Sequence, residues 1–383
     1  MNSTQRRIAS HLLLTPQGFF KQPLLTVDSA SRRILAIEQY DEQLDMSAGV
    51  EFYSGIICAG FINAHSHLEL AYMRGAIDEG CGQGAFAAQM AAQRNRFSDE
   101  ERQEAIAAAD HLMWREGVDA VADIVNDDSS FATKLHSPIH YRSFAEVFGL
   151  RQSNIEACRQ LLRYDPTTLT PHSTYSIQSR DFEAVCRADS SAPISIHFME
   201  SADEALLYKG SGSLHEWYAQ VGFHCDFLHY GSPARRIAQC VPNDRPLILV
   251  HNTYIDEEAI DTILANRTAP TYWVLCPQSN RYINRCTPRS VELLRQKGCT
   301  ICIGTDSLAS NHTLSIVEEL KCFRDVPLEE LLRWATRNGA EAIGLGDRLG
   351  TVEVGRCVGL VALSGIDLSA MRLTDKSVAT RIL

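Results

Sequence analysis

The chain has 383 residues, of which 45% are hydrophobic and 22% charged, a balance typical of a folded globular protein and not of a disordered one. Its length exceeds that of an ordinary single domain and predicts one large domain with a smaller appendage. The formal net charge is −11 and no stripe of Lys and Arg follows the chain, which argues against nucleic acid as a partner.

The chain begins MNSTQRRIASHLLLTPQGFF, with an apolar run of only three leucines. Such a run is too short for the core of a signal peptide or for a membrane span. The twelve cysteines are scattered along the chain, and "CTIC", from Cys299 to Cys302, has the pattern of a buried strand. Buried free thiols in a reducing compartment fit this distribution better than a disulfide framework or a thiolate zinc site. We therefore expect a cytoplasmic protein with no membrane partner.

Short apolar and β-branched runs recur through the middle of the chain and alternate with amphipathic helical stretches. Eight buried strands that alternate with helices predict an α/β fold, a TIM-like (β/α)8 barrel. The strand-like runs cover residues 55–64, 119–125, 141–149, 168–177, 193–199, 246–253, 271–276 and 299–306. The helical stretches cover residues 99–116, 154–163, 179–189, 256–266, 288–297 and 314–344.

The two ends of the chain do not continue this alternation. Residues 1–54 and 347–383 contain shorter β-like pieces, which could pair into one small sheet that joins the termini. We therefore expect the barrel domain to cover residues 55–346 and the flanking segments to form a smaller unit. Residues 211–233 interrupt the repeat with Trp, Phe and Tyr and predict a packed loop over the barrel mouth.

Polar side chains stand at the expected carboxyl ends of the strands, where barrel enzymes place their active sites. Five of the thirteen histidines fall there, together with two carboxylic acids, which isolated core histidines do not explain. The residues are His65 and His67 on the first strand, His172 on the fourth, His197 with Glu200 on the fifth, His251 on the sixth, Asn280 on the seventh and Asp306 on the eighth.

The pair His65 and His67, in "NAHSHLEL", is either two metal ligands or two polar residues at the end of a strand. Residues i and i+2 of a strand point to the same face, so both imidazoles can reach one ion. Imidazole and carboxylate ligands suit a borderline divalent metal, and three or four protein ligands leave a position for water. With His197 and Asp306 also at the carboxyl ends of their strands, the metal interpretation is favoured. Zinc and ferrous iron share this ligand preference.

Six ordered motifs resemble the amidohydrolase superfamily: "GFINAHSHLEL", "PHSTYSIQ", "SIHFMES", "LVHNT", "CPQSN" and "GTDSLASN". More narrowly, they are similar to its branch of cytosine, guanine and adenosine-type deaminases, which hold one metal ion per site. The resemblance extends over nearly the whole chain, including the tail "ATRNGAEAIGLGDRLGTVEVG". It implies a barrel with a small β-sandwich formed by residues 1–54 and 347–383. The motifs are specific for the fold and the metal site and far less specific for the substrate.

The resemblance implies a site with one divalent ion, Zn²⁺ by preference and Fe²⁺ as the alternative. The implied ligands are His65, His67, His197 and Asp306. No lysine stands at the end of the fourth strand, where binuclear relatives carry a carboxylated lysine that bridges two metals.

The resemblance also implies roles in catalysis. Asp306 would accept a proton from the attacking water, and His251 would orient that water. Glu200 would protonate a ring nitrogen of the substrate, and His172 matches a histidine that contacts substrate in nucleoside deaminases. The implied reaction is hydrolytic deamination of an amino-substituted heterocycle, such as a purine, a pyrimidine or an adenosine-like nucleoside, with release of ammonia.

Two departures from the family pattern limit the assignment. Gly359, in "CVGLVAL", stands where the family usually has an acidic residue, so the C-terminal β unit could pack differently. The segment after the histidine pair also lacks the tryptophan-containing stretch of thioadenosine and homocysteinyl-adenosine deaminases. This second departure weakens the assignment of any particular nucleoside.

Several residues keep a structural alternative. Glu200 could instead cap the following helix, where a carboxylate favours the helix dipole. His172 could simply hold its loop, and Asn280 either contacts substrate or braces a turn. Glu69 either contacts the substrate or pairs with Arg74.

The activity also keeps alternatives. The same site could open a cyclic amide or remove a halogen from a ring, as in imidazolonepropionase-like or chlorohydrolase-like relatives. A catalytically silent binding barrel should have a broken site, and this sequence keeps every candidate ligand. The expected partner is a small-molecule substrate, and a homo-oligomer is compatible with the sequence.

Overall fold

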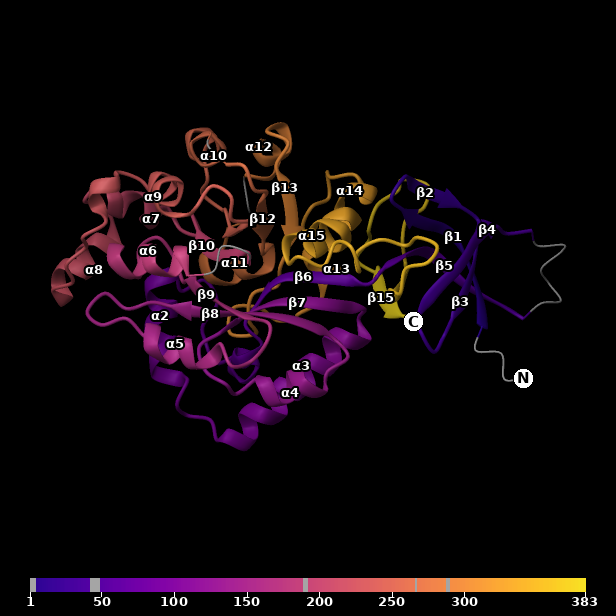
Figure 1. The fold of residues 1–383 in the computed structure, drawn as a ribbon, viewed down its shortest axis with the longest axis horizontal. Helices are drawn as coiled ribbons and strands as arrows, with labels where there is room; N and C mark the ends of the chain where they lie inside the picture. Colours follow the sequence, from indigo (N-terminus) through magenta and orange to yellow (C-terminus); the bar gives the residue numbers. More distant parts are fainter. Residues whose placement is uncertain (1–4, 42–48, 189–191, 266, 287–289) are drawn as a thin grey trace.

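The computed structural model describes residues 5–41, 49–188, 192–265, 267–286 and 290–383. Figure 1 shows strands surrounded by helices over most of the molecule and a separate sheet at one end, to which both termini return. In the described part of the chain, no helix is both long and apolar enough to cross a membrane.

Strands from both ends of the chain form one mixed sheet (Figure 1). Its order is β15-β14-β5-β1-β3-β4, and β2 pairs with the end of β1. Because β14 pairs with β5, the C-terminal strands extend the N-terminal sheet, as expected for a β unit shared by the termini. The strands are β1 (Gln5–Thr15), β2 (Gly18–Lys21), β3 (Pro23–Asp28), β4 (Arg33–Gln39), β5 (Val50–Ala59), β14 (Leu360–Ser364) and β15 (Val378–Arg381).

Eight further strands form the predicted (β/α)8 barrel, which is confirmed. They make two four-stranded parallel sheets, β6-β7-β8-β9 and β10-β11-β12-β13. Isolated parallel bridges from Ser173 to His197 and from Ser66 to Asp306 connect the two sheets into a closed circle. The strands are β6 (Phe61–Ser66), β7 (Val118–Val125), β8 (His140–Val147), β9 (Thr167–Pro171), β10 (Ile194–Phe198), β11 (Leu247–His251), β12 (Thr271–Leu275) and β13 (Thr300–Ile303).

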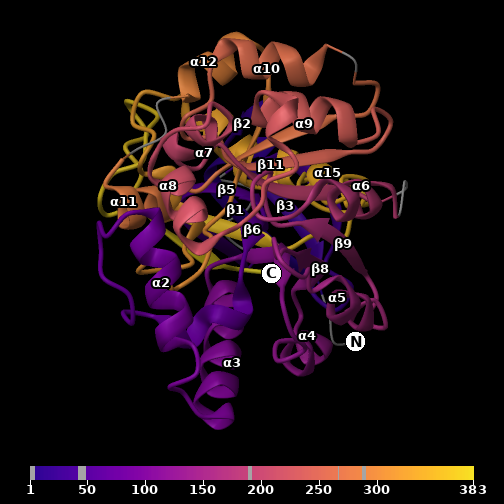
Figure 2. The same cartoon turned by 90° about the vertical axis from the view of Figure 1, so that its left-hand side faces the viewer.

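The barrel strands are apolar because they are buried on both faces. β7, β10, β11 and β12 are buried along their whole length, as parallel strands covered by helices must be. Figure 2 shows the helices surrounding the central strands. They are η1 (Leu68–Met73), α2 (Gln83–Gln93), α3 (Asp99–Arg115), α4 (Phe131–His136), α5 (Ile155–Leu161), α6 (Ser179–Arg187), α7 (Ala202–Tyr208), α8 (Ser213–Val221), η2 (Leu228–Tyr230), α9 (Pro233–Cys240), α10 (Glu257–Leu264), α11 (Pro277–Asn284), α12 (Val291–Gln296), α13 (Ile316–Leu320), α14 (Leu328–Arg333), η3 (Trp334–Asn338) and α15 (Gly339–Ala342).

The first strand predicted for the barrel, residues 55–64, is wrong in its boundaries. Residues 50–59 belong to β5 of the terminal sheet, and the first barrel strand is β6. The apolar run is continuous because it passes from one core to the other through Gly60, whose N–H donates to the carbonyl of Gly359 at 2.9 Å. The division of the chain into residues 1–54, 55–346 and 347–383 stays a prediction, and β5 crosses the first of its boundaries.

The glycine at position 359 has a packing reason. The carboxylate of Asp119, on β7, accepts the Gly359 N–H at 2.8 Å and pairs with Arg381 at 2.8 Å. A Cβ at position 359 would lie 2.3 Å from the Asp119 carboxylate. An acidic side chain from the barrel therefore occupies the space beside the C-terminal strands, and any side chain at position 359 would collide with it.

Two predicted elements differ from the structure. The helical stretch 314–344 is divided into α13, α14, the π-helical segment η3 and α15, with Pro327 at the start of α14. Residues 211–233, predicted as a loop, contain helix α8 between Gly212 and Gly222 and the short η2. Both glycines have positive φ, 89° and 69°, which lets the chain turn sharply at each end of α8. The predicted helix ends at residues 189, 266 and 288–289 lie outside the described residues.

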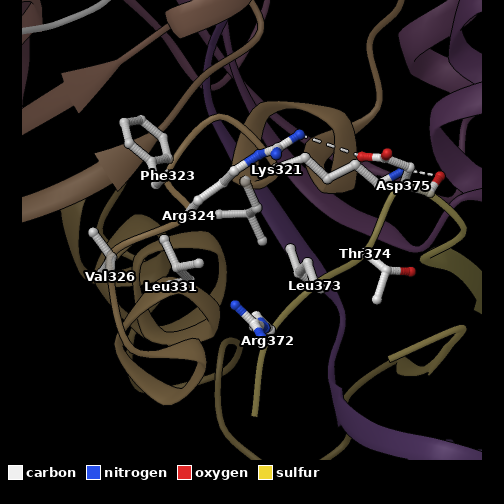
Figure 3. A pocket seen from close by; sticks show the side chains of 10 residues that line it. Lys321, Phe323, Arg324, Val326, Leu331, Arg372, Leu373, Thr374 and Asp375 are labelled. Atoms are coloured by element: carbon white, nitrogen blue, oxygen red, sulfur yellow. Dashed lines mark hydrogen bonds and ion pairs between the residues drawn. The ribbon is translucent and has the colours of Figure 1, made fainter. Parts of the chain in front are cut away.

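A pocket of about 260 Å³ lies between α13, α14 and the C-terminal segment (Figure 3). Phe323, Val326 and Leu331 supply apolar walls, and Lys321 hydrogen-bonds to the carbonyl of Asp375 at its rim. None of the residues predicted for the active site lines this pocket. It is therefore separate from the chemistry expected at the strand ends.

Candidate active site

The first barrel strand delivers the histidine pair to the barrel mouth. His65 is fully buried in β6, and His67 follows that strand and begins η1. Asn63 ties this segment to the eighth strand, because its amide donates to Thr305 Oγ1 at 2.7 Å and its Oδ1 accepts the Thr305 N–H at 3.1 Å. Gly304 allows the close approach, since a Cβ there would lie 2.8 Å from the Cβ of His65.

The four residues predicted as metal ligands lie together. Nε2 of His67 is 3.3 Å from Nε2 of His197 and 3.5 Å from Oδ1 of Asp306. Nε2 of His65 is 3.7 Å from the same Oδ1. Ligand atoms about 2.0–2.1 Å from one ion are roughly 3–4 Å from one another. These separations therefore fit a single divalent ion held between the four side chains.

The ring nitrogens at this cluster are buried. Nε2 of His65, the atom that faces Asp306, has no hydrogen-bond partner among the described residues, and neither has Nε2 of His251, the atom that faces Glu200. Burial lowers the pKa of His65 and His67, and it lowers the pKa of His197 and His251 to about 4. The imidazoles are therefore neutral near pH 7, and a neutral imidazole keeps the lone pair that a metal ion needs.

Hydrogen bonds at Nδ1 orient two of the imidazoles. Nδ1 of His197 lies 2.9 Å from the carbonyl of His172, and Nδ1 of His251 lies 3.1 Å from Oδ1 of Asn280. Both partners are acceptors, so each Nδ1 carries the hydrogen and each Nε2 carries the lone pair. Nε2 of His197 thus faces His67, and Nε2 of His251 faces Glu200.

Asp306 is held with one oxygen directed at the histidines. Its Oδ2 accepts hydrogen bonds from the hydroxyls of Ser279 at 2.6 Å and Ser310 at 2.8 Å. Its Oδ1 is the atom that faces His65 and His67. Asp306 has a φ of 58°, an uncommon backbone conformation that places this carboxylate just past the end of β13.

Glu200 is a buried acid beside His251. Its Oε1 lies 3.7 Å from Nε2 of His251, and its Oε2 accepts a hydrogen bond from the amide of Gln83 at 2.8 Å. Burial and the nearby charge of Asp306 raise the pKa of Glu200 to about 8. The N-cap of α7 is Ser201, and within the described residues the printed hydrogen bond of the Glu200 carboxyl group goes to Gln83 and not to the backbone of that helix, whose Glu204 carboxylate instead accepts the backbone N–H of Glu200. The alternative role as a helix cap is therefore not supported.

His172 lies beside His197 and is partly exposed. Its ring stacks on that of His197 with centroids 4.6 Å apart and planes 18° apart, and 29% of its side chain is exposed. Its Nε2 is 3.9 Å from the carboxylate of Glu146, which is buried at the end of the third barrel strand. His172 is therefore the partly exposed member of the histidine group, where a substrate could contact it.

Glu69 does not pair with Arg74. The Glu69 carboxylate accepts the backbone N–H of Asn126 at 2.8 Å and its side-chain amide at 3.0 Å. Arg74 instead donates to the carbonyl of His312 at 2.7 Å. The polar atoms of Glu69 are thus engaged by the loop that follows β7, and of the two alternatives left open by the sequence, the pair with Arg74 is not formed.

Three features of the site were not predicted. Glu146 is a carboxylate inside the otherwise apolar run "YRSFAEVFG", which was a usable signal. Ser279 and Ser310 lie within two of the recognised motifs, but the bond from Ser279 to Asp306 spans 27 positions and carries no sequence signature. Gln83 gave no signal, because only the tertiary fold brings it to Glu200, 117 positions away.

We expect His251→Asn to keep the metal ion and lose turnover, because the family resemblance implies that His251 orients the water. Nε2 of His251 lies 3.7 Å from Glu200, and a ring nitrogen of His251 also lies within 4.8 Å of those of His65 and His197, so metal retention tests that role directly. Asparagine tolerates the left-handed backbone at this position, where φ is 77°, so the substitution adds little strain. Metal content by elemental analysis and ammonia release should be measured on the same preparation. Metal loss as severe as in His197→Ala would show that the two histidines are ranked wrongly.

The chain matches a family model over most of its length. The model, described as the amidohydrolase family, covers residues 56–379. That range includes every barrel strand and β14, and it ends inside β15. The fold and this match define the class of protein, a hydrolase that acts on carbon–nitrogen bonds. The chain belongs to the amidohydrolase family.

Two relatives are similar over most of the chain. The adenosine deaminase of Helicobacter pylori is 27% identical over 322 residues, which are 77% of this chain and 76% of the relative. The aminodeoxyfutalosine deaminase of Nitratiruptor sp. is 24% identical and covers 92% of this chain and 89% of the relative. Both are named as deaminases.

Solved structures share the fold. The aminofutalosine deaminase of Helicobacter pylori in complex with methylthio-coformycin has a TM-score of 0.78 at 24% identity, with 93% and 92% of the two chains covered. An adenosine deaminase from Xanthomonas campestris with bound zinc has a TM-score of 0.72 at 21% identity, with 97% and 86% covered. Atrazine chlorohydrolase from Arthrobacter aurescens, complexed with zinc, has a TM-score of 0.71 at 19% identity. The match covers 94% of this chain and 88% of that chain.

Proposed function

We propose that this chain is a hydrolytic deaminase of an adenosine-like nucleoside. The observation that carries the proposal is Glu200, a buried carboxyl group with a pKa raised to about 8 that lies 3.7 Å from His251 beside the histidine cluster. At neutral pH such a group is protonated and can act as a general acid. An amino-heterocycle requires this step, because protonation of a ring nitrogen makes the amino-bearing carbon electrophilic.

The choice of an adenosine-like substrate over a pyrimidine or guanine is supported by the relatives. The curated relatives are named as deaminases of adenosine and of aminodeoxyfutalosine. The most similar of the structures described above holds methylthio-coformycin. The proposal therefore names the class of substrate, an adenosine-like nucleoside, and the substrate panel described below is needed to identify the particular nucleoside.

One divalent ion, zinc, completes the proposed site, with His65, His67, His197 and Asp306 as its ligands. The separations of their ligand atoms, 3.3–3.7 Å, and their buried, neutral imidazoles fit such an ion. Two structures of the same fold contain zinc. When bound, the ion supplies a Lewis acid that can lower the pKa of a water molecule from 15.7 to about 7.

The remaining steps belong to side chains of this chain. Nε2 of His251 accepts a hydrogen bond from the attacking water, because Asn280 holds the hydrogen on Nδ1. Oδ1 of Asp306 accepts a proton from that water. Oε1 of Glu200 protonates the ring nitrogen. The water oxygen bonds to the amino-bearing carbon, and the proton taken up by Asp306 passes to the amino nitrogen. The carbon–nitrogen bond then breaks, ammonia leaves, and the remaining hydroxyl proton returns to the ionised Glu200 as the carbonyl forms.

We propose His172 as a substrate contact, since its partly exposed ring lies beside His197. We propose that Glu69 and Asn280 do not contact the substrate themselves but position other side chains that do the chemistry or line the site. Glu69 holds Asn126, whose amide also contacts the carboxylate of Glu146 at 3.2 Å. Asn280 holds His251.

The test is a substrate panel offered to zinc-loaded protein. We expect ammonia release from adenosine or a 5′-substituted adenosine, and weaker or no release from guanine and cytosine. A chlorinated triazine with chloride detection and a cyclic amide with a ring-opening assay should be run in parallel. Chloride release or ring opening as the dominant activity would replace deamination by the alternative hydrolysis. Ammonia release from cytosine or guanine alone would contradict the nucleoside assignment.

A further inference from the structure

Residues 74–98 follow η1, contain α2 and dock on α11. The N–H of Gly80 donates to the carbonyl of Tyr282 at 2.6 Å, and the N–H of Gly82 donates to the carbonyl of Ile283 at 2.9 Å. The Tyr282 hydroxyl donates back to the carbonyl of Ile77 at 2.7 Å. Figure 2 shows α2 beside α11. These backbone bonds place the start of α2 at the mouth of the barrel.

Gln83 is the first residue of α2 and reaches Glu200 from there. Its Nε2 donates to Oε2 of Glu200 at 2.8 Å. Its Oε1, in the same planar amide, is buried and has no hydrogen-bond partner within the described residues. The other oxygen of Glu200, Oε1, lies 3.7 Å from Nε2 of His251. The two carboxyl oxygens therefore face different groups, a hydrogen-bond donor on one side and the proposed water site on the other.

We propose that Gln83 is a positioning residue that keeps the transferable proton of Glu200 on Oε1. An oxygen that accepts an N–H at 2.8 Å uses its lone pair as an acceptor and is a poor place for a proton. The proton is thereby held on the oxygen nearest His251, where the proposed water and ring nitrogen meet. This inference rests on the proposed deamination for its consequence in turnover, but the contact itself can be tested without substrate.

Helix α11 supports both the Gln83–Glu200 contact and His251, the histidine proposed to orient the water. The helix holds the loop before Gln83 through the carbonyls of Tyr282 and Ile283, and it carries Asn280, which orients His251. One helix thus sets the directions of both the acid and the residue that faces it. The unpartnered Oε1 of Gln83 adds an acceptor beside Glu200 that is available to an N–H of a substrate.

Two substitutions test the donor contribution, since both remove the N–H that binds Glu200. Gln83→Met keeps the length of the side chain and removes both polar atoms, whereas Gln83→Glu keeps an acceptor and removes the donor. We expect both variants to retain zinc and thermal stability and to lose kcat by roughly 10- to 100-fold, the cost of a misplaced catalytic group, with a smaller change in KM. The matched control is Gln89→Met on the same helix, since Gln89 bonds to the N–H of Asp78 and does not touch Glu200.

The titration of Glu200 gives a readout that needs no substrate. It can be monitored in zinc-loaded protein through the NMR signals of ¹³C-labelled glutamate carboxyl groups. The signal that is missing from Glu200→Gln belongs to Glu200. The donor stabilises the ionised form, so Gln83→Met should raise the pKa of Glu200, whereas Gln89→Met should leave it unchanged. An unchanged titration in Gln83→Met would overturn the inference, and normal kcat in both Gln83 variants would do the same. A shifted titration in a protein that deaminates nothing would leave the contact standing and remove the proposed function.

Discussion

Glu200→Gln is expected to lower ammonia release by roughly 10²- to 10⁴-fold while metal content and fold stay near wild type. Glutamine preserves the size of the side chain and can still hydrogen-bond to Gln83, but it has no transferable proton. The buried carboxyl of Glu200, with its pKa raised to about 8, is the acid that the proposed reaction requires. Turnover, bound metal and melting temperature should be measured on the same preparation.

The control for this experiment is Asp203→Asn. Asp203 lies in the first turn of α7 and accepts hydrogen bonds from the N–H and hydroxyl of Ser213, at 3.0 and 2.7 Å. Its replacement removes a carboxylate from the start of the same helix and should cost about 1 kcal/mol of stability with activity largely kept. If Glu200→Gln behaved like Asp203→Asn, less stable but active, Glu200 would have no part in the mechanism and the deaminase proposal would lose its proton donor.

His65→Ala and His67→Ala are expected to lose the metal ion and with it essentially all activity. Wild-type protein should carry about one divalent ion per chain, because the four ligand side chains converge on one point. An ion that binds only the folded state stabilises it by mass action, so both variants should also melt at lower temperature and respond less to added zinc. Elemental analysis and thermal melts with and without chelator measure both effects.

The matched control is His136→Ala, which removes an exposed histidine at the end of α4 and should change neither metal content nor melting temperature. Unaltered metal in His65→Ala would refute the ligand assignment. Two ions per wild-type chain would contradict the single-metal proposal and direct attention to Glu146, His172 and His197, whose ligand atoms also lie within 4.8 Å of one another.

The class of fold and the centre of the site were predictable because their signals are local. Alternation of buried runs and amphipathic stretches indicates a barrel whatever the exact boundaries, and the spacing of His65 and His67 places both on one face of a strand. The prediction that His197 and Asp306 join them followed from a general property of barrels, in which the carboxyl ends of all strands meet. The family match confirms the fold and the class of chemistry.

The boundaries were less predictable for the same physical reason. An apolar run marks burial and does not say in which core it is buried, so β5 and β6 appeared as one strand. The break lies at Gly60, where a Cβ would be 2.2 Å from the Cγ of Asp119, a residue of another strand. Likewise, the apolar residues of α13, α14 and α15 kept helical spacing across breaks that the sequence pattern did not mark.

The sequence by itself therefore determined which residues are candidates for metal binding and acid–base chemistry, since residue type and strand-end position are encoded locally. Only the tertiary structure decided how those residues are oriented: Asn280 on His251, Ser279 and Ser310 on Asp306, and Gln83 on Glu200. Each of these bonds is directional and short-ranged, and each joins side chains from segments that become neighbours only when the barrel closes. Their partners depend on the folded backbone, and no periodicity in the chain records them.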